Sequence, residues 1–177
     1  MGNERHTHFV TFTTVNWVDF FIRKEYRSVL IKSMAYCQQH KGLKVYAYCI
    51  MTSHVHLIIS SNGVYKEDTI RDFKRYTSWC SNKLLTAEDT NYESRKEWML
   101  WMIQRAGKKK TNINCFQFWQ YGSHPMELFS DKVFYQKMDY IHLNPVVSGF
   151  VCQPEDWLYS SARNYAGLPS LIQLVDD

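Results

Sequence analysis

The 177 residues of this chain contain neither a long apolar run nor a typical secretory signal. No apolar run reaches the length of about eighteen residues that a membrane-spanning helix needs, so we expect no membrane partner. The first residues, MGNERHTHFVTF, carry an acid and histidines where a secretory signal needs basic and then apolar residues. The sequence therefore favours a cytoplasmic protein.

The chain also lacks paired cysteines. Its five cysteines form no C-x-x-C motif and lie scattered at positions 37, 49, 80, 115 and 152. An odd number of cysteines without metal-type spacing indicates reduced thiols, which act mostly as small core residues. This usage is typical of a cytoplasmic protein.

What the composition does offer is a high aromatic content with a mild positive charge. Aromatic residues make up 16% of the chain, including 6 Trp and 12 Tyr, and the net charge is +4. Rings interleaved with Lys and Arg can stack on unpaired bases. Most of these rings will belong to the core, and many plain enzymes are as basic. Composition therefore fits a nucleic-acid partner without requiring one.

Hydrophobic periodicity predicts a single α+β domain over residues 1–177, with an insert at about 87–114. The expected elements, in chain order, are a strand at 6–16, a helix at 23–40 that Gly42 ends, strands at 43–51 and 54–60, a helix at 66–85, a short helix within the insert, a strand at 115–121 and a helix at 130–144 that Pro145 stops. No repeat, low-complexity tract or linker interrupts them. This order indicates a ferredoxin-like antiparallel sheet with helices packed on it.

The run CIMTSHVHLIIS, residues 49–60, places His54 and His56 two apart in an apolar strand. Because side chains alternate along a strand, both imidazoles point to one face, while Val55 and Leu57 point to the other and suit a core. Two imidazoles on a rigid strand can share one cation. The spacing alone is a weak signal, because histidine is frequent at interfaces and beside metal ligands.

A second H-x-H pair, His6 and His8, lies near the N-terminus, where backbones fray. We favour a structural role for that pair. For His54 and His56 a metal role requires further ligands, because hard ions such as Mg²⁺ or Mn²⁺ also need oxygen.

Tyr140 and Asn144 supply the next candidates in the stretch DYIHLNP. Four residues apart on a helix, they share one face. Pro145 disfavours helical geometry for Asn144, so we expect the amide at a frayed last turn. A tyrosine oxygen can attack a phosphodiester when a cation neutralises the developing charge. A helix tyrosine is more often a half-buried core residue, and Tyr135 is the rival nucleophile on the same helix.

These residues resemble a known family. MTSHVHLIIS, followed by FWQ, DYIHLNPVVSGFV and WLYSSARNYAG, resembles the REP-associated tyrosine transposases of the HUH-type single-tyrosine superfamily, which act on single-stranded DNA. The resemblance covers nearly the whole chain. It implies an HUH-type catalytic domain that binds hairpin DNA beside an unpaired tetranucleotide. It also implies a place near the nucleoid.

The resemblance implies a role for each candidate. His54 and His56 match the histidines of the metal-binding HUH element, Asn144 matches the third ligand, and Tyr140 matches the nucleophile that becomes joined to a 5′ phosphate. The implied cofactor is Mg²⁺ or Mn²⁺. Relatives occur as monomers and as homodimers, and the sequence leaves both open.

Two features depart from the family pattern. The insert with WMLWMIQRAGKKK is longer than in compact members, and Val147 stands where a basic residue is common. We expect DNA phosphates to contact basic residues of the second helix and the insert, namely Arg71, Lys74, Arg75, Arg105, Lys108, Lys109 and Lys110. Trp98, Trp101 and Phe118 would then form a stacking groove beside them.

The sequence thus predicts a metal-dependent single-stranded DNA endonuclease and strand transferase with a 5′-phosphotyrosine intermediate. A non-catalytic module of the same fold that binds hairpin DNA or RNA is the alternative. A hydrolytic metalloenzyme that uses the histidine pair without a covalent step is a third reading.

Overall fold

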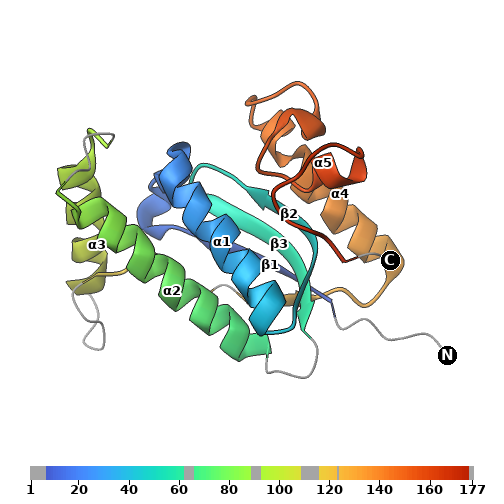
Figure 1. Cartoon of the computed structure of the whole chain (residues 1–177), viewed down its shortest axis with the longest axis horizontal. Helices are drawn as coiled ribbons and strands as arrows, with labels where there is room; N and C mark the ends of the chain where they lie inside the picture. The colour runs from blue at the N-terminus through green and yellow to red at the C-terminus, as the bar shows by residue number, and fades with distance from the viewer. Residues whose placement is uncertain (1–6, 62–65, 89–92, 109–115, 123, 176–177) are drawn as a thin grey trace.

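The chain builds an antiparallel sheet with helices packed on both faces (Figure 1). The computed structural model describes residues 7–61, 66–88, 93–108, 116–122 and 124–175. Within those ranges the strands lie in the order β2-β3-β1-β4, and each neighbouring pair is antiparallel. The strands are β1 (His8–Thr13), β2 (Leu43–Ile50), β3 (His54–Ser61) and β4 (Met126–Glu127). This order confirms the predicted ferredoxin-like α+β fold.

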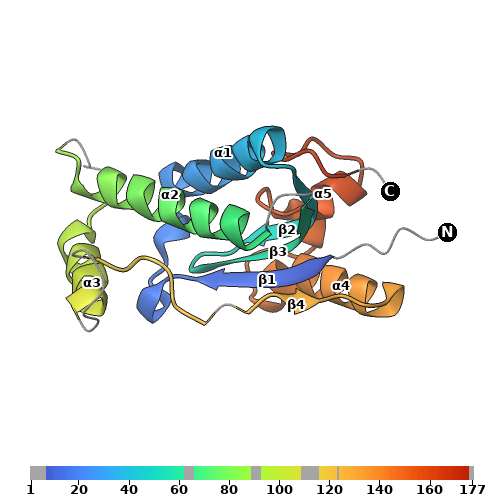
Figure 2. The same ribbon diagram turned by 90° about the horizontal axis from the view of Figure 1, so that it is seen from below.

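The helices form separate layers. Figure 2 shows α1 (Lys24–His40) and α2 (Lys66–Thr86) on one face of the sheet and α4 (Asp131–Val147) on the other. Helix α3 (Lys96–Lys108), the predicted helix of the insert, stands beside one end of α2 (Figure 1). The short helices are η1 (Val15–Trp17), η2 (Phe20–Ile22), η3 (Pro154–Asp156) and α5 (Ala162–Tyr165). Across the described ranges, each helix is too short or too polar to cross a bilayer.

Alternation along β3 decides which residues reach each layer. Val55 and Leu57 join the core under α1 and α2, whereas Ile58 packs with Phe134 and Ile141 of α4. His54 and His56 share the parity of Ile58, so their side chains face the α4 layer. The face predicted for the histidine pair is therefore the one observed.

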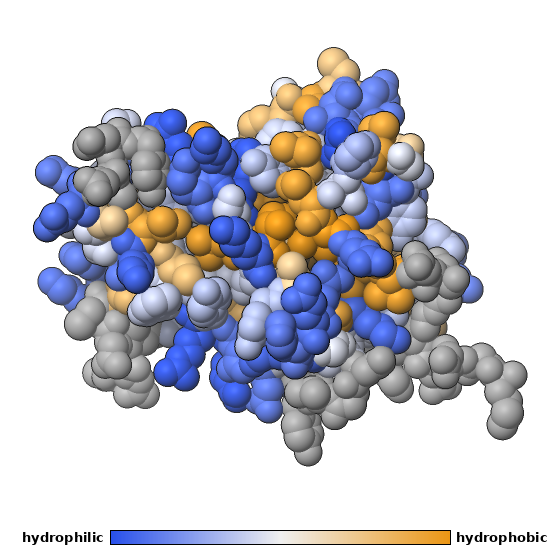
Figure 3. Space-filling view, viewed as in Figure 1, coloured by the Kyte–Doolittle hydropathy of each residue, from blue (hydrophilic) through white to orange (hydrophobic). Residues whose placement is uncertain are grey.

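The C-terminal segment closes the edge of the sheet at β2. Ile172 is 3% exposed within the main core, and the Val175 N–H donates to the Val45 carbonyl. Figure 3, viewed from the side of α1 and α2, shows hydrophobic side chains gathered between α1 and this C-terminal segment. The chain up to Val175 therefore belongs to the folded body.

The strand predicted at 115–121 is wrong for its described part, residues 116–121. These residues make one isolated bridge, between Trp119 and Thr14, and the edge strand is β4 instead. Phe118 and Trp119 are 1% and 5% exposed. The apolar pattern that suggested a strand therefore comes from two rings that fill the core.

The expectation that Pro145 stops the last long helix is also wrong. Helix α4 continues to Val147 and ends before Gly149, whose φ of 74° suits only glycine well. Pro145 lacks an N–H, so one intrahelical bond is lost, but the Ser148 N–H still donates to the Asn144 carbonyl. Asn144 consequently lies within the helix.

On α2, Phe73 faces the core, but Trp79 is 54% exposed. Trp79 lies six residues after Phe73, about 120° away around the helix. Thr77, four residues after Phe73, is buried in that place. The buried face of α2 continues through Thr77 to Leu85, and Trp79 lies off it.

Candidate active site

The histidine pair lies on the side of β3 that faces α4. The ring centroids of His54 and His56 are 4.7 Å apart, and the rings are nearly perpendicular at 75°. His56 is 3% exposed, while His54 is only partly buried. A rigid strand therefore holds two imidazoles side by side at the edge of a buried layer.

Helix α4 brings the predicted tyrosine and amide to this pair. The ring centroids of His56 and Tyr140 are 5.3 Å apart, and the Tyr140 side chain is 49% exposed. The side-chain nitrogen of Asn144 lies 3.3 Å from Nε2 of His56. Rotating this amide by 180° puts its oxygen at the same point. Residues 54, 56, 140 and 144 thus converge on one place.

Both imidazoles have their Nδ1 atoms engaged by hydroxyl groups. Thr11 Oγ1 lies 2.8 Å from Nδ1 of His56, and Ser53 Oγ lies 3.2 Å from Nδ1 of His54. A hydrogen bond at one ring nitrogen is the arrangement typical of histidine that binds metal through the other. Nε2 of each ring is therefore the atom suited to a cation.

The donor set fits a divalent cation when Asn144 is included. Among the described residues, no group of three or more His, Cys, Asp or Glu could hold a metal ion. Two imidazoles and one amide oxygen leave positions for water or phosphate oxygen, which suits Mg²⁺ or Mn²⁺. The side chains that would hold the ion are His54, His56 and Asn144.

Burial keeps both imidazoles uncharged at neutral pH. It lowers the pKa of His56 to about 3, with further contributions from the positive charges of His54 and Lys137. Burial also lowers the pKa of His54. A neutral imidazole is the form that binds a cation.

Four residues that the sequence analysis did not single out complete the lining. Phe9, Thr11, Trp17 and Lys137 line the same cavity of about 570 Å³ as the four predicted residues. The Lys137 ammonium nitrogen lies 5.0 Å from the centre of the Phe9 ring and 5.7 Å from that of Tyr140. Helical spacing could have indicated Lys137, which precedes Tyr140 by three residues.

Tyr135 and His142 lie on other faces of α4. Tyr135 is 52% exposed and packs against Phe134, outside the cavity. The His142 Nε2 lies 2.8 Å from the Ser161 hydroxyl, and burial lowers the pKa of His142 to about 4. His142 therefore contacts Ser161 and lies outside the cavity.

The predicted phosphate contacts on α2 are not next to the histidine pair. Arg71 pairs with Asp68 and Asp72, at 2.6 and 3.5 Å. The Lys74 ammonium donates to the Gln120 carbonyl at 3.3 Å, and burial lowers its pKa. Arg75 lines a cavity between α1 and α2, across the sheet. Their assignment to DNA stays a prediction.

In the insert, Arg105 lies with its guanidinium carbon 4.9 Å from the centre of the Trp101 ring. Lys108 is exposed at the end of α3, while Lys109, Lys110 and His6 fall outside the described residues. Trp101 is 50% exposed, and Trp98 is 47% exposed. Phe118 is buried, so its predicted place in a stacking groove was wrong.

The fold as a whole is similar to that of a solved structure. A structure titled as the REP-associated tyrosine transposase bound to a REP hairpin matches with a TM-score of 0.62 and 19% identity, over 98% of this chain and 87% of that one. A putative transposase from Deinococcus radiodurans R1 gives a TM-score of 0.38 and 15% identity, over 76% and 87% of the chains. At 19% identity, the first match shows that the two proteins share a fold, and no more.

Sequence comparison identifies the family. No curated protein matches this chain. The family described as "Transposase IS200 like" matches residues 3–112, which include the histidine pair and end before Tyr140 and Asn144. Because that match covers more than half of the sequence, the chain belongs to the IS200-like transposase family.

Proposed function

We propose that this protein is a metal-dependent single-stranded DNA endonuclease and strand transferase that acts at hairpin repeats. The observation that carries the proposal is that Tyr140 lies beside the histidine pair. The ring centroids of Tyr140 and His56 are 5.3 Å apart. An exposed phenol beside a set of cation ligands is what phosphodiester transfer to tyrosine requires. Hydrolysis of DNA has no such need of a phenol.

Tyr140 is the nucleophile in this proposal. Its oxygen attacks the phosphorus of a DNA phosphodiester, a bond from phosphorus to tyrosine forms, and the bond to the 3′ oxygen breaks. The phenol loses one proton and the departing 3′ oxygen gains one, so a free 3′-OH and a 5′-phosphotyrosine result. The ester retains the energy of the broken bond, so the reverse attack by a 3′-OH rejoins DNA.

His54, His56 and Asn144 hold the cofactor in this proposal. A divalent cation, Mg²⁺ or Mn²⁺, would supply positive charge that neutralises the phosphate as it is attacked. Thr11 and Ser53 orient the two imidazoles through their Nδ1 atoms, at 2.8 and 3.2 Å. That orientation directs both Nε2 atoms away from the strand.

Lys137 adds a second positive charge on the phenol side of the cavity. Its ammonium lies 5.7 Å from the centre of the Tyr140 ring, and no described carboxylate pairs with it. A preorganised cation stabilises the charge that develops on a phosphate during transfer. Lys137 therefore contacts the substrate phosphate in this proposal.

Hairpin DNA as the partner is supported by the relative whose title names a REP hairpin. We extend the HUH-type domain to the whole chain, residues 1–177, with the insert as part of it. Action on genomic repeats would place the protein at the nucleoid, as a monomer or a homodimer.

A covalent adduct tests the proposal. A 5′-labelled and a 3′-labelled single-stranded repeat hairpin are incubated with the protein and Mn²⁺ or Mg²⁺, then resolved under denaturing conditions. The fragment that begins with the attacked phosphate carries the 3′ label. We expect this 3′ label to remain with the protein and the 5′ label to be released on the fragment that ends in a free 3′-OH. Tyr140→Phe should abolish the adduct, and His54→Ala should reduce it.

Tyr135→Phe is the matched control, because Tyr135 lies on the same helix with a similar exposure of 52% against 49%. It should form the adduct normally. Cleavage that persists in Tyr140→Phe would point to the hydrolytic enzyme. Binding without any cleavage by the parent protein would point to the non-catalytic hairpin-binding module.

A further inference from the structure

The loop that follows β1 holds two consecutive residues in an unusual conformation. Asn16 has φ 53° and Trp17 has φ 57°, and they are the only non-glycine residues with positive φ in the described part of the chain. Asparagine tolerates this region, but a bulky residue such as tryptophan is disfavoured there. Such strain persists only where surrounding contacts enforce it, and it is frequent at functional sites.

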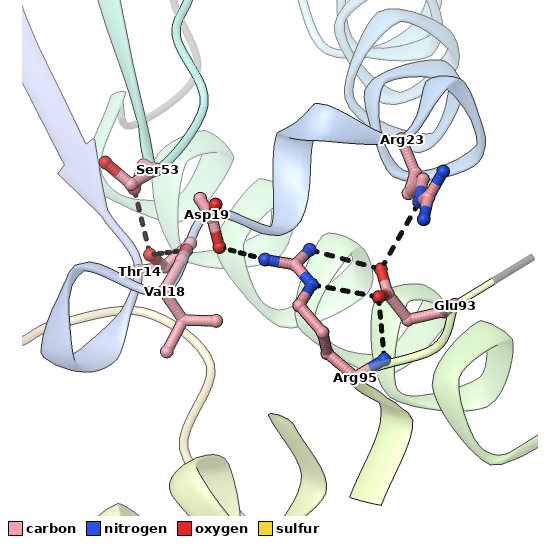
Figure 4. A network of polar contacts seen from close by, with 7 residues as sticks. All are labelled: Thr14, Val18, Asp19, Arg23, Ser53, Glu93 and Arg95. Carbon is pink, nitrogen blue, oxygen red and sulfur yellow. Dashed lines mark hydrogen bonds and ion pairs between the residues drawn. The ribbon is translucent and has the colours of Figure 1, made fainter. Parts of the chain in front are cut away.

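A network of polar contacts enforces the loop conformation (Figure 4). The Thr14 hydroxyl lies 2.6 Å from the Val18 carbonyl oxygen and 2.9 Å from that of Ser53. Arg95 donates to the Asp19 carboxylate at the far end of the loop. The strained segment is thus fixed at both of its ends.

Arg95 is itself held by the buried carboxylate of Glu93. Its Nε lies 3.0 Å from Oε1 of Glu93, whose side chain is 0% exposed, and Arg23 approaches the other oxygen at 3.8 Å. These contacts lie just before α3, so the same network fastens the insert helix to the loop (Figure 4). Side-chain contacts therefore join the loop to the start of α3.

The network presents Trp17 to solvent instead of burying it. Trp17 is 60% exposed, yet its ring lies edge-on to His54 with centroids 5.5 Å apart. It lines the active-site cavity on one side and a second cavity of about 690 Å³ on the other. Trp17 therefore links the catalytic residues to the surface of α3.

The second cavity has the chemistry of a site for an unpaired nucleotide. Trp17, Trp101 and Tyr121 line it, all at least half exposed, and the Arg105 guanidinium lies over the Trp101 ring at 4.9 Å. No described acidic residue lines it. Exposed rings stack on bases, and an arginine without nearby carboxylates in the lining suits the phosphates between them.

We propose that this cavity is a stacking site for an unpaired base next to the scissile phosphate, with Trp17 as the platform beside the catalytic residues. The site rests on the proposed function for the position of that phosphate. The insert helix supplies the opposite wall through Trp101 and Arg105, and this gives the insert a role in holding the single strand.

Anisotropy of a fluorescein-labelled 12-nucleotide oligothymidylate tests the site, in EDTA and in a Tyr140→Phe background so that no chemistry contributes. One stacked base contributes about 1–3 kcal/mol, so Trp17→Ala should weaken binding about tenfold, and Trp17→Phe should recover most of it. Trp101→Ala, outside the strained loop, should also weaken binding. The slope of affinity against salt should stay the same, because no phosphate contact is removed.

Two controls separate stacking from a general effect. A 12-unit abasic strand carries the same phosphates without bases, so the parent and Trp17→Ala should bind it equally. Trp79→Ala, at a ring 54% exposed on α2, should bind like the parent. Equal binding of oligothymidylate by Trp17→Ala, Trp101→Ala and the parent would overturn the stacking site. So would an equal loss on the abasic strand.

The adduct assay distinguishes failure of this site from failure of the proposed function. An adduct in the parent together with unchanged binding by the Trp17 and Trp101 variants would remove only the stacking site. No adduct, together with the expected loss of oligothymidylate binding, would remove only the proposed strand transfer.

Discussion

The side-chain amide of Asn144 lies 3.3 Å from Nε2 of His56, across the boundary between α4 and β3. The two residues are 88 positions apart in the sequence, and the contact fixes the last turns of α4 over the histidine pair. The same contact places the amide oxygen, after rotation of the group, where a cation on Nε2 would need a ligand.

Asn144→Leu should therefore weaken Mn²⁺ binding by about tenfold or more, because it removes one of the three proposed protein ligands. Asn144→Asp should bind Mn²⁺ more tightly than the parent, since a carboxylate adds charge to the site. Isothermal titration calorimetry of the metal alone measures both effects. Leu143→Ala, an exposed neighbour on α4, is the control and should leave affinity unchanged. Parent-like affinity in Asn144→Leu would exclude the amide from the cation site.

Lys137→Met should lower the rate of adduct formation by about a hundredfold, because a preorganised cation beside the attacked phosphate is lost. Lys137→Arg should recover part of the rate, since it restores the charge with a different shape. Single-turnover adduct formation at saturating DNA separates this effect from binding.

Lys132→Met provides the comparison for this prediction, because Lys132 is exposed on the first turn of the same helix and does not line the cavity. It should react at the parent rate. If both methionine variants slowed equally, net charge rather than the position of Lys137 would explain the effect.

Local sequence patterns were sufficient to predict which side chains lie together in the central part of the site. Alternation along β3 placed His54 and His56 on one face, and helical spacing placed Tyr140 and Asn144 together. Both patterns concern residues within one element, where backbone geometry alone decides the direction of a side chain.

The rest of the site depends on contacts between distant segments. Arg95 and Asp19 are 76 positions apart, and nothing in either local sequence indicates that they pair. That pair holds the end of the loop that carries Trp17, so the place of Trp17 beside His54 could not be predicted from local sequence. The prediction that Phe118 belongs to a stacking groove was wrong for a related reason. Core residues that are distant in the sequence bury its ring, and local sequence does not indicate that packing.

The buried carboxylate of Glu93 leads to a prediction about stability. Glu93→Gln keeps the volume but removes the charge that pairs with Arg23 and Arg95, so that Asp19 is the carboxylate left to Arg95. Breaking a buried ion pair costs about 3–5 kcal/mol, and we expect about 3 kcal/mol because both arginines reach solvent. Urea unfolding at pH 7 measures the difference. Glu97→Gln, an exposed acid on the first turn of α3, should change stability by less than about 1 kcal/mol.

The loss in Glu93→Gln should itself depend on pH. Burial raises the pKa of the Glu93 carboxyl, but hydrogen bonds from Arg95 outweigh it and hold the pKa below its ordinary value. A carboxylate with a lowered pKa stabilises the fold above its unfolded-state pKa, and this contribution is lost as the pH falls through the folded-state value. The gap between parent and variant should therefore be full at pH 7 and narrow below about pH 4. A gap that stayed constant down to pH 3 would show that packing of the side chain, and not its charge, fastens α3 to the Trp17 loop.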